Sequence, residues 1–131
     1  MVTEIKDVYK GFHDALILNV NYNAVDKGDG YNNERILTVD VHVLNQRTKI
    51  WEFVKLIFTG VIKFKFFDSK KICSTAIFEA YIERVEDLVV FDFFALQVDG
   101  RYQLAEDPNS TFVVHCKEVK YEVMDFNVLK K

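Results

Sequence analysis

The sequence has little of what makes linkers, disulfide frameworks or membrane spans. Its 131 residues include one proline and five glycines, which argues against a low-complexity linker. Its two cysteines, Cys73 and Cys116, lack the spacing of a metal knuckle or a C-x-x-C redox motif, so we expect two buried thiols. No run of 18 apolar residues occurs, and the first ten residues lack a cationic region followed by an apolar core. We therefore expect a cytoplasmic protein that is neither exported nor inserted in a membrane.

A large excess of one charge is also absent. The chain has 17 basic and 20 acidic residues, a net charge of −3, so it lacks the basic field that drives nucleic-acid binding. Residues 1–65 carry nine basic and eight acidic residues, a net +1, whereas residues 66–131 carry eight and twelve, a net −4. The acidic second half favours a basic protein as the partner.

The chain does contain enough apolar material for one core. Half of its residues are hydrophobic and 15% are aromatic, including twelve phenylalanines. A chain of this length buries roughly two-thirds of its unfolded surface without needing a disulfide or a metal. No repeat or change of composition marks a boundary, so we predict a single domain over residues 1–131.

Most of the chain alternates apolar and polar residues with a period of two, which is typical of strands. Residues on one face of the run 15–22 are Leu16, Leu18, Val20 and Tyr22. Residues expected to point inward in the run 35–44 are Leu37, Val39, Val41 and Val43, with Thr38, Asp40 and His42 pointing outward. Further alternating runs cover 50–58, 63–66, 72–84 and 111–123, and 88–97 is expected to be a strand that is apolar on both faces. Helix is the rival interpretation for 72–84, but the stricter alternation there favours a strand.

Turn residues separate these runs. The strongest turn signals are "VDGR" at 98–101 and "EDPNS" at 106–110, and Gly60 marks a bulge or a break after the run 50–58. Residues 3–10 have weak helical character. We predict an all-β (β-rich) fold, a single antiparallel β-sandwich or open barrel of about seven strands with at most one short helix.

Two pairs of adjacent residues invite a catalytic interpretation. His13 and Asp14 are the residue types of acid–base catalysis, and His115 and Cys116 are those of nucleophilic catalysis. Neighbouring residues on a strand point to opposite faces, however, so neither pair is well placed unless the backbone turns there. The favoured interpretation is structural: His13 and Asp14 shape the entrance to the first strand, and Cys116 packs in the core.

Metal and cofactor motifs are missing. The loop "DKGDGYNNE" at 26–34 departs from the calcium-binding pattern, because Gly28 stands where the second ligand belongs and Leu37 where the final glutamate belongs. The three histidines are dispersed, and neither a Walker loop nor G-x-G-x-x-G occurs. We expect neither a metal nor another cofactor.

The segments "GFHDALILNVNYN", "LTVDVHVLN", "W…VKLIFTGV" and "FVVHCKEVKYEV" resemble a group of small bacterial domains found among polymorphic-toxin immunity proteins. The shared pattern is a His-Asp near the first strand, alternating strands, a Phe-x-Gly-Val after the third strand and a last strand ending near V-x-Y. This resemblance implies a β-rich fold and a stoichiometric binding role. It also implies that His13-Asp14 and Phe58-x-Gly60-Val61 are fold determinants rather than a catalytic centre.

Our first functional hypothesis is a non-enzymatic, intracellular protein-binding module of the immunity type, which neutralises a cognate toxin, such as a basic toxin domain. Acidic residues would steer that partner and Trp51 would anchor it. The candidate contact residues are Asp26, Asp29, Asp40, Trp51, Glu79, Glu83, Glu86 and Asp87.

Two alternatives come from other classes of protein. One is a small hydrolase or ligand-binding β-barrel that uses His13 and Asp14, with His115 or Cys116, at an apolar cavity. The other is a homo-oligomer joined through sheet edges or through the aromatic strand 89–96.

Overall fold

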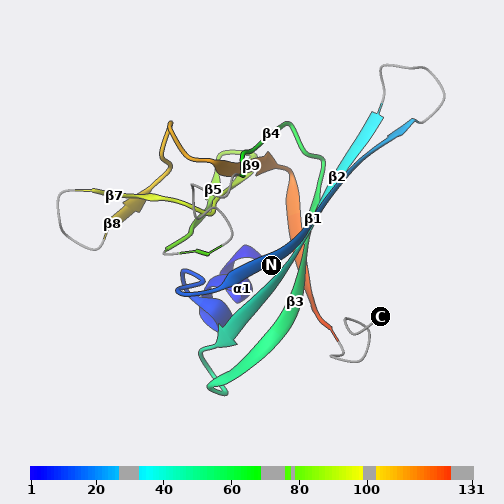
Figure 1. Cartoon of the computed structure of the whole chain (residues 1–131). Coiled ribbons are helices and arrows are strands. Elements are labelled where there is room, and N and C mark those ends of the chain that lie inside the picture. Colours follow the sequence, from blue (N-terminus) through cyan, green and yellow to red (C-terminus); the bar gives the residue numbers. More distant parts are fainter. Residues whose placement is uncertain (27–32, 69–75, 78, 99–102, 125–131) are drawn as a thin grey trace.

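The computed structural model describes residues 1–26, 33–68, 76–77, 79–98 and 103–124. These residues form the helix α1 (Val2–Tyr9) and ten strands (Figure 1). The strands are β1 (Leu16–Asp26), β2 (Asn33–Asn45), β3 (Ile50–Thr59), β4 (Lys63–Phe66), β5 (Tyr81–Val85), β6 (Leu88–Asp92), β7 (Leu96–Val98), β8 (Gln103–Ala105), β9 (Phe112–Cys116) and β10 (Glu118–Val123). The prediction of a β-rich fold with at most one short helix is confirmed. The described residues form ten strands where about seven were predicted, because the runs 88–97 and 111–123 are each divided in two and β8 is added.

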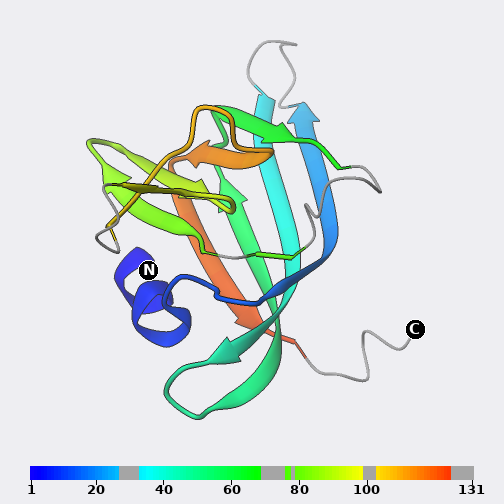
Figure 2. The ribbon, with the colours of Figure 1, turned by 60° about the vertical axis from the view of Figure 1, so that its left-hand side comes forward.

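Two four-stranded antiparallel sheets enclose the core. The first sheet has the order β1-β2-β3-β10, the second has the order β4-β9-β6-β5, and β7 and β8 form a separate hairpin (Figure 2). A single bridge between Leu16 and Ala76 brings the start of β1 close to the segment that precedes β5. The architecture is therefore an open barrel or sandwich, as predicted.

Two segments pass from one sheet to the other at the same corner. The chain leaves β3 at Gly60, which has a φ of 62°, and enters β4 in the second sheet. The run 111–123 was predicted as one strand, but it is divided at Lys117 into β9 and β10, which lie in different sheets. The two breaks are joined, because the Lys117 amide donates hydrogen bonds to the carbonyls of Thr59 at 3.1 Å and Gly60 at 3.2 Å. The break predicted at Gly60 is confirmed.

Substituting Gly60 tests this corner. In Gly60→Ala, the new methyl group would lie 3.0 Å from Lys117 Cβ, and the backbone would keep a left-handed conformation that alanine disfavours. We expect the free energy of unfolding to fall by about 1–2 kcal/mol. Urea denaturation measures this, and an unchanged or higher midpoint would contradict the role given to Gly60.

The core is built from the inward faces that the alternation predicts, together with α1. Leu37, Val39, Val41 and Val43 of β2 are buried, as expected. The helix adds Ile5, Val8 and Tyr9, whose spacing places them on one helical face. The helix α1 is eight residues long. Within the described ranges, no helix is both long enough and apolar enough to cross a membrane.

A bulge changes the face that the start of β1 presents. The register with β2 shifts between Ile17 and Asn19, so Ile17 points into the core while Leu16 lies on the outer face beside His42. Leu16 is 45% exposed and Ile17 is 7% exposed. The alternation predicted for 15–22 therefore holds only after the bulge, where Val20 pairs with Val39.

The second sheet contains the described part of the run 72–84 and the aromatic strand expected at 89–96. Of the run 72–84, residues 72–75 and 78 lie outside the described residues, and the described remainder contains the strand β5 and no helix. A turn at Glu86 and Asp87 joins β5 to β6. The aromatic run in and after β6 is buried by the chain itself, since Phe91 and Phe93 are fully buried. That run needs no second copy to cover it.

Asp92 ends β6 as a buried carboxylate. Its Oδ1 accepts hydrogen bonds from the Phe94 amide at 2.9 Å and the Ser110 hydroxyl at 2.5 Å, and its Oδ2 accepts one from the Asp107 amide at 2.7 Å. The turn predicted at 106–110 is confirmed by a bond from the Ser110 amide to the Asp107 carbonyl. Asp92 therefore ties this turn to β6.

Candidate functional site

The loop 10–14 between α1 and β1 contains the His13-Asp14 pair and has an unusual backbone. Lys10, Phe12 and Asp14 have φ values of 54°, 56° and 63°, which residues other than glycine rarely adopt. Such conformations persist only where the surroundings enforce them. The side chain of Phe12 is fully buried, and its ring centre lies 5.5 Å from that of Phe91.

Backbone hydrogen bonds fix the same loop to the segment before β5. The Ala80 amide donates to the Gly11 carbonyl at 2.7 Å, and the Asp14 amide donates to the Ile77 carbonyl at 2.9 Å. These two bonds tie the loop to residues 77–80, and local bonds from the Phe12 amide to the Tyr9 carbonyl and from the Ala15 amide to the Phe12 carbonyl shape the loop itself.

The turn at Asp14 brings the two side chains of the pair together. Asp14 Oδ2 lies 3.3 Å from His13 Nε2, and Glu79 Oε1 lies 3.2 Å from His13 Nδ1. The imidazole therefore lies between two carboxylates on a surface where the His13 side chain is 51% exposed. This arrangement orients the ring and links the loop to the segment before β5. The backbone turn that the sequence analysis named as the condition for the two side chains to meet is therefore present.

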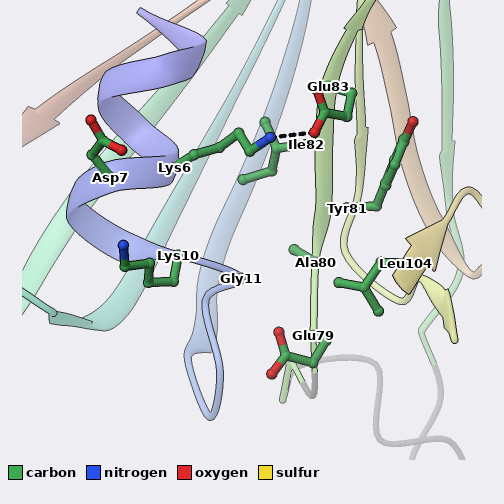
Figure 3. A pocket seen from close by; sticks show the side chains of 10 residues that line it. All are labelled: Lys6, Asp7, Lys10, Gly11, Glu79, Ala80, Tyr81, Ile82, Glu83 and Leu104. Atoms are coloured by element: carbon green, nitrogen blue, oxygen red, sulfur yellow. Dashed lines mark hydrogen bonds and ion pairs between the residues drawn. The ribbon is translucent and has the colours of Figure 1, made fainter. Parts of the chain in front are cut away.

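A groove of about 400 Å³ lies beside this loop, between α1 and β5 (Figure 3). Charged side chains project along it: Lys6 and Lys10 come from the helix and its end, and Glu79 and Glu83 come from the facing segment. Lys6 forms an ion pair with Glu83 across the groove. The groove is therefore lined by both charged and apolar side chains, the latter including Ile82 and Leu104.

The contact between His13 and Glu79 can be tested through Gly11. A Cβ atom on Gly11 would lie 2.1 Å from Glu79 Oε2, so Gly11→Ala should push this carboxylate away from the imidazole. Exposed ion pairs contribute about 0–1 kcal/mol, so we expect a loss of stability within that range. We also expect a shift of the His13 ring resonances in NMR spectra. Glu79→Ala is the control that removes the carboxylate directly; unchanged His13 resonances in both variants would contradict the contact.

The second pair, His115 and Cys116, is divided between the two faces of β9. The Cys116 thiol is fully buried, burial raises its pKa to about 12, and it donates a hydrogen bond to the Glu118 carbonyl at 3.3 Å. His115 points the other way, and its Nε2 lies 2.5 Å from Glu106 Oε2. The thiol stays protonated near pH 7, so it lacks the thiolate that a nucleophile requires. Cys73 lies outside the described residues.

A cluster of apolar and aromatic side chains lies on the outer face of the first sheet. Leu16, His42 and Phe53 are opposite one another on β1, β2 and β3, and Trp51 lies two residues before Phe53 on the same face. The His42 ring stacks on Phe53 with centres 4.5 Å apart and lies 5.2 Å from the Trp51 ring. Trp51 and Leu16 are each 45% exposed. We call these four residues the outer aromatic patch.

A polar row borders this patch on the same face. Asp40 Oδ1 lies 2.9 Å from Lys55 Nζ, and the Asn19 amide group donates to Asp40 Oδ2 at 3.2 Å. The sequence predicted Asp40 to be an exposed contact residue, but its side chain is buried at 6% exposure. The prediction that Asp40 lies on the outward face of the strand is correct. The prediction that it is exposed is wrong, because Lys55 and Asn19 cover its carboxylate.

The other acidic candidates are dispersed rather than gathered at one site. Glu79 and Glu83 flank the groove and are paired with His13 and Lys6. Glu86 and Asp87 are exposed in the turn between β5 and β6. Asp29 and the side chain of Asp26 lie outside the described residues. Of the candidates that the structure describes, Trp51 alone belongs to the outer aromatic patch.

Sequence analysis did not identify the rest of this patch. It placed His42 on an outward face, but the register that sets His42 beside Phe53 and Leu16 is not encoded in any local motif. Within the described residues, no group of three or more histidine, cysteine or acidic side chains is arranged to hold a metal ion. No protein-family model, curated protein or solved structure matches the chain.

Proposed function

We propose that this protein is a non-enzymatic binding module of the immunity type, which neutralises a protein partner by occupying it in a fixed stoichiometry. The outer aromatic patch is the contact surface, and the partner is a basic domain with an apolar centre to its binding face. Trp51 is the anchor of the contact.

The observation that carries this proposal is the exposure of Trp51 beside a stacked His42 and Phe53. Tryptophan is enriched among the residues that dominate binding energy, and a rigid aromatic neighbourhood limits the entropy lost when it is covered. The sheet beneath supports the patch, since Val41 and Val54 on the opposite face are fully buried. A preformed surface of this kind suits a stoichiometric inhibitor, which gains affinity from needing little rearrangement.

The sign of the partner's charge follows from the chain's own charge. The net charge is −3, and exposed acids such as Glu86 and Asp87 lie in residues 66–131, which carry a net −4. The outer aromatic patch itself lies in residues 1–65, which carry a net +1, so the preference for a basic partner rests on the field of the whole chain and not on charges at the patch. Such a field speeds the encounter with a basic domain and disfavours acidic competitors.

Co-expression with the products of the genes adjacent to its own tests this proposal. We expect one basic protein to co-purify in an equimolar ratio to this chain, and to lose its toxic activity in the complex. Retention of no neighbouring product, or of a product whose activity is unchanged in the complex, would overturn the immunity-type function.

A further inference from the structure

The four strands at the edges of the two sheets differ in charge. Edge strands normally carry charged residues, which prevent them from pairing with another chain. Three of the four edges follow this rule: β10 has Glu118, Lys120 and Glu122, β4 has Lys63 and Lys65, and β5 has Glu83 and Arg84. The edge strand β1 has no charged residue and no proline from Leu16 to Val25.

Within the described residues, the backbone of the central part of β1 pairs with one strand, β2, and Ala76 bridges only its first residue, Leu16. The Tyr22 ring stacks on that of Phe64 with centres 5.4 Å apart, so β4 contacts this edge through a side chain and not through backbone hydrogen bonds. Leu18 is 48% exposed and Tyr22 is 41% exposed. Figure 1 shows the end of β1 and the start of β2 extending away from the second sheet.

The sequence of this edge is self-complementary in an antiparallel arrangement. Residues 19–23 read "NVNYN", so the polar and apolar positions are the same in both directions. Three asparagines, Asn19, Asn21 and Asn23, share one face, and the Asn23 amide group donates to Asn21 Oδ1 at 3.1 Å. Val20 and Tyr22 lie on the other face, opposite Val39 and Leu37 of β2.

We propose that two copies of this chain pair through β1, antiparallel and around a two-fold axis at Asn21. Asn21 then lies opposite its own copy, Asn19 lies opposite Asn23 and Val20 lies opposite Tyr22. Each pair therefore joins two polar or two apolar residues. An asparagine side chain carries both hydrogen-bond donors and acceptors, so it can bond to the amide group that faces it. The four-stranded first sheet of each copy becomes half of one continuous sheet.

We choose the axis at Asn21 by comparing the residue pairs that it forms with those of a neighbouring register. An axis at Tyr22 would put Asn19 opposite Val25 and Leu18 opposite Asp26. The axis at Asn21 avoids both mismatches within residues 19–23, where β1 is regular, and its one Leu–Asp pair, Leu16 with Asp26, falls at the ends, where Leu16 is already bridged to Ala76. The resulting dimer is isologous, as most homodimers are. This dimer does not depend on the outer aromatic patch or on any function proposed for it.

Two opposite charges at Asn21 test the dimer and its axis together. By sedimentation velocity over a range of concentrations, the wild-type chain should be a dimer. Asn21→Lys and Asn21→Asp each place like charges opposite each other, so each should raise the dimer dissociation constant by about tenfold or more. An equimolar mixture of the two variants should restore the dimer as a heterodimer, because the charges at the axis are then opposite.

Each outcome decides the proposal. A wild-type monomer at all concentrations would overturn it, as would two single variants that dimerise like the wild type. A mixture that stays monomeric would overturn the axis at Asn21. The side chain of Asn21 is exposed, so we expect the circular dichroism spectra of both variants to match that of the wild type.

Discussion

Replacing Asp92 with alanine should lower the free energy of unfolding by about 3–5 kcal/mol. The carboxylate is fully buried and accepts hydrogen bonds from two amides and the Ser110 hydroxyl. Alanine would leave the Phe94 and Asp107 amides without their acceptor, and the Ser110 hydroxyl with the Phe112 carbonyl alone, at 3.2 Å. Each unsatisfied buried donor costs about 1–3 kcal/mol. The turn 106–110 would also lose its attachment to β6.

Chemical denaturation of Asp92→Ala measures this loss, with Asp87→Ala as the matched control. Asp87 is exposed in the turn between β5 and β6, so its replacement should change stability by no more than about 0.5 kcal/mol. Equal effects of the two substitutions would show that Asp92 does not organise the turn.

Replacing Phe91 with alanine should be similarly damaging, at about 3–5 kcal/mol. The Phe91 ring is fully buried, and its centre lies 5.5 Å from Phe12, 5.3 Å from Phe58 and 4.4 Å from Phe93. It therefore joins the loop 10–14 and the first sheet to the second sheet. Its removal would leave a cavity at the point where all three meet.

Phe67→Ala is the control for this substitution, because Phe67 is 51% exposed. We expect its thermal midpoint to stay close to that of the wild type, whereas Phe91→Ala should melt well below it. A small effect at Phe91 would mean that the sheets and the loop are held together elsewhere.

Local pattern predicted the faces of the strands better than their limits. The alternation in 35–44 identified the buried residues of β2, and Gly60 marked the end of β3. The break at Lys117 had no local signal, since it arises from the facing corner at Gly60 on a strand distant in sequence. The bulge after Ile17 was missed for the same reason, because it is defined only by the pairing with β2.

For the candidate site too, local pattern identified single residues but not how the fold groups them. Sequence proposed Trp51 as an anchor, and the structure places it on an outer face with an exposed ring. Its neighbours Leu16, His42 and Phe53 come from three strands and depend on register. Asp40 was expected to be exposed because period two gives only the face of a residue, not what covers it.

The most direct test of the binding function compares Trp51→Ala with Phe67→Ala against the partner that co-purifies with the wild type. The two side chains are exposed to similar extents, 45% and 51%, but Trp51 alone lies in the outer aromatic patch. Isothermal titration calorimetry should show about 30-fold weaker binding for Trp51→Ala, as for the loss of a dominant contact, and unchanged binding for Phe67→Ala. Wild-type affinity in Trp51→Ala would contradict the patch as the contact surface.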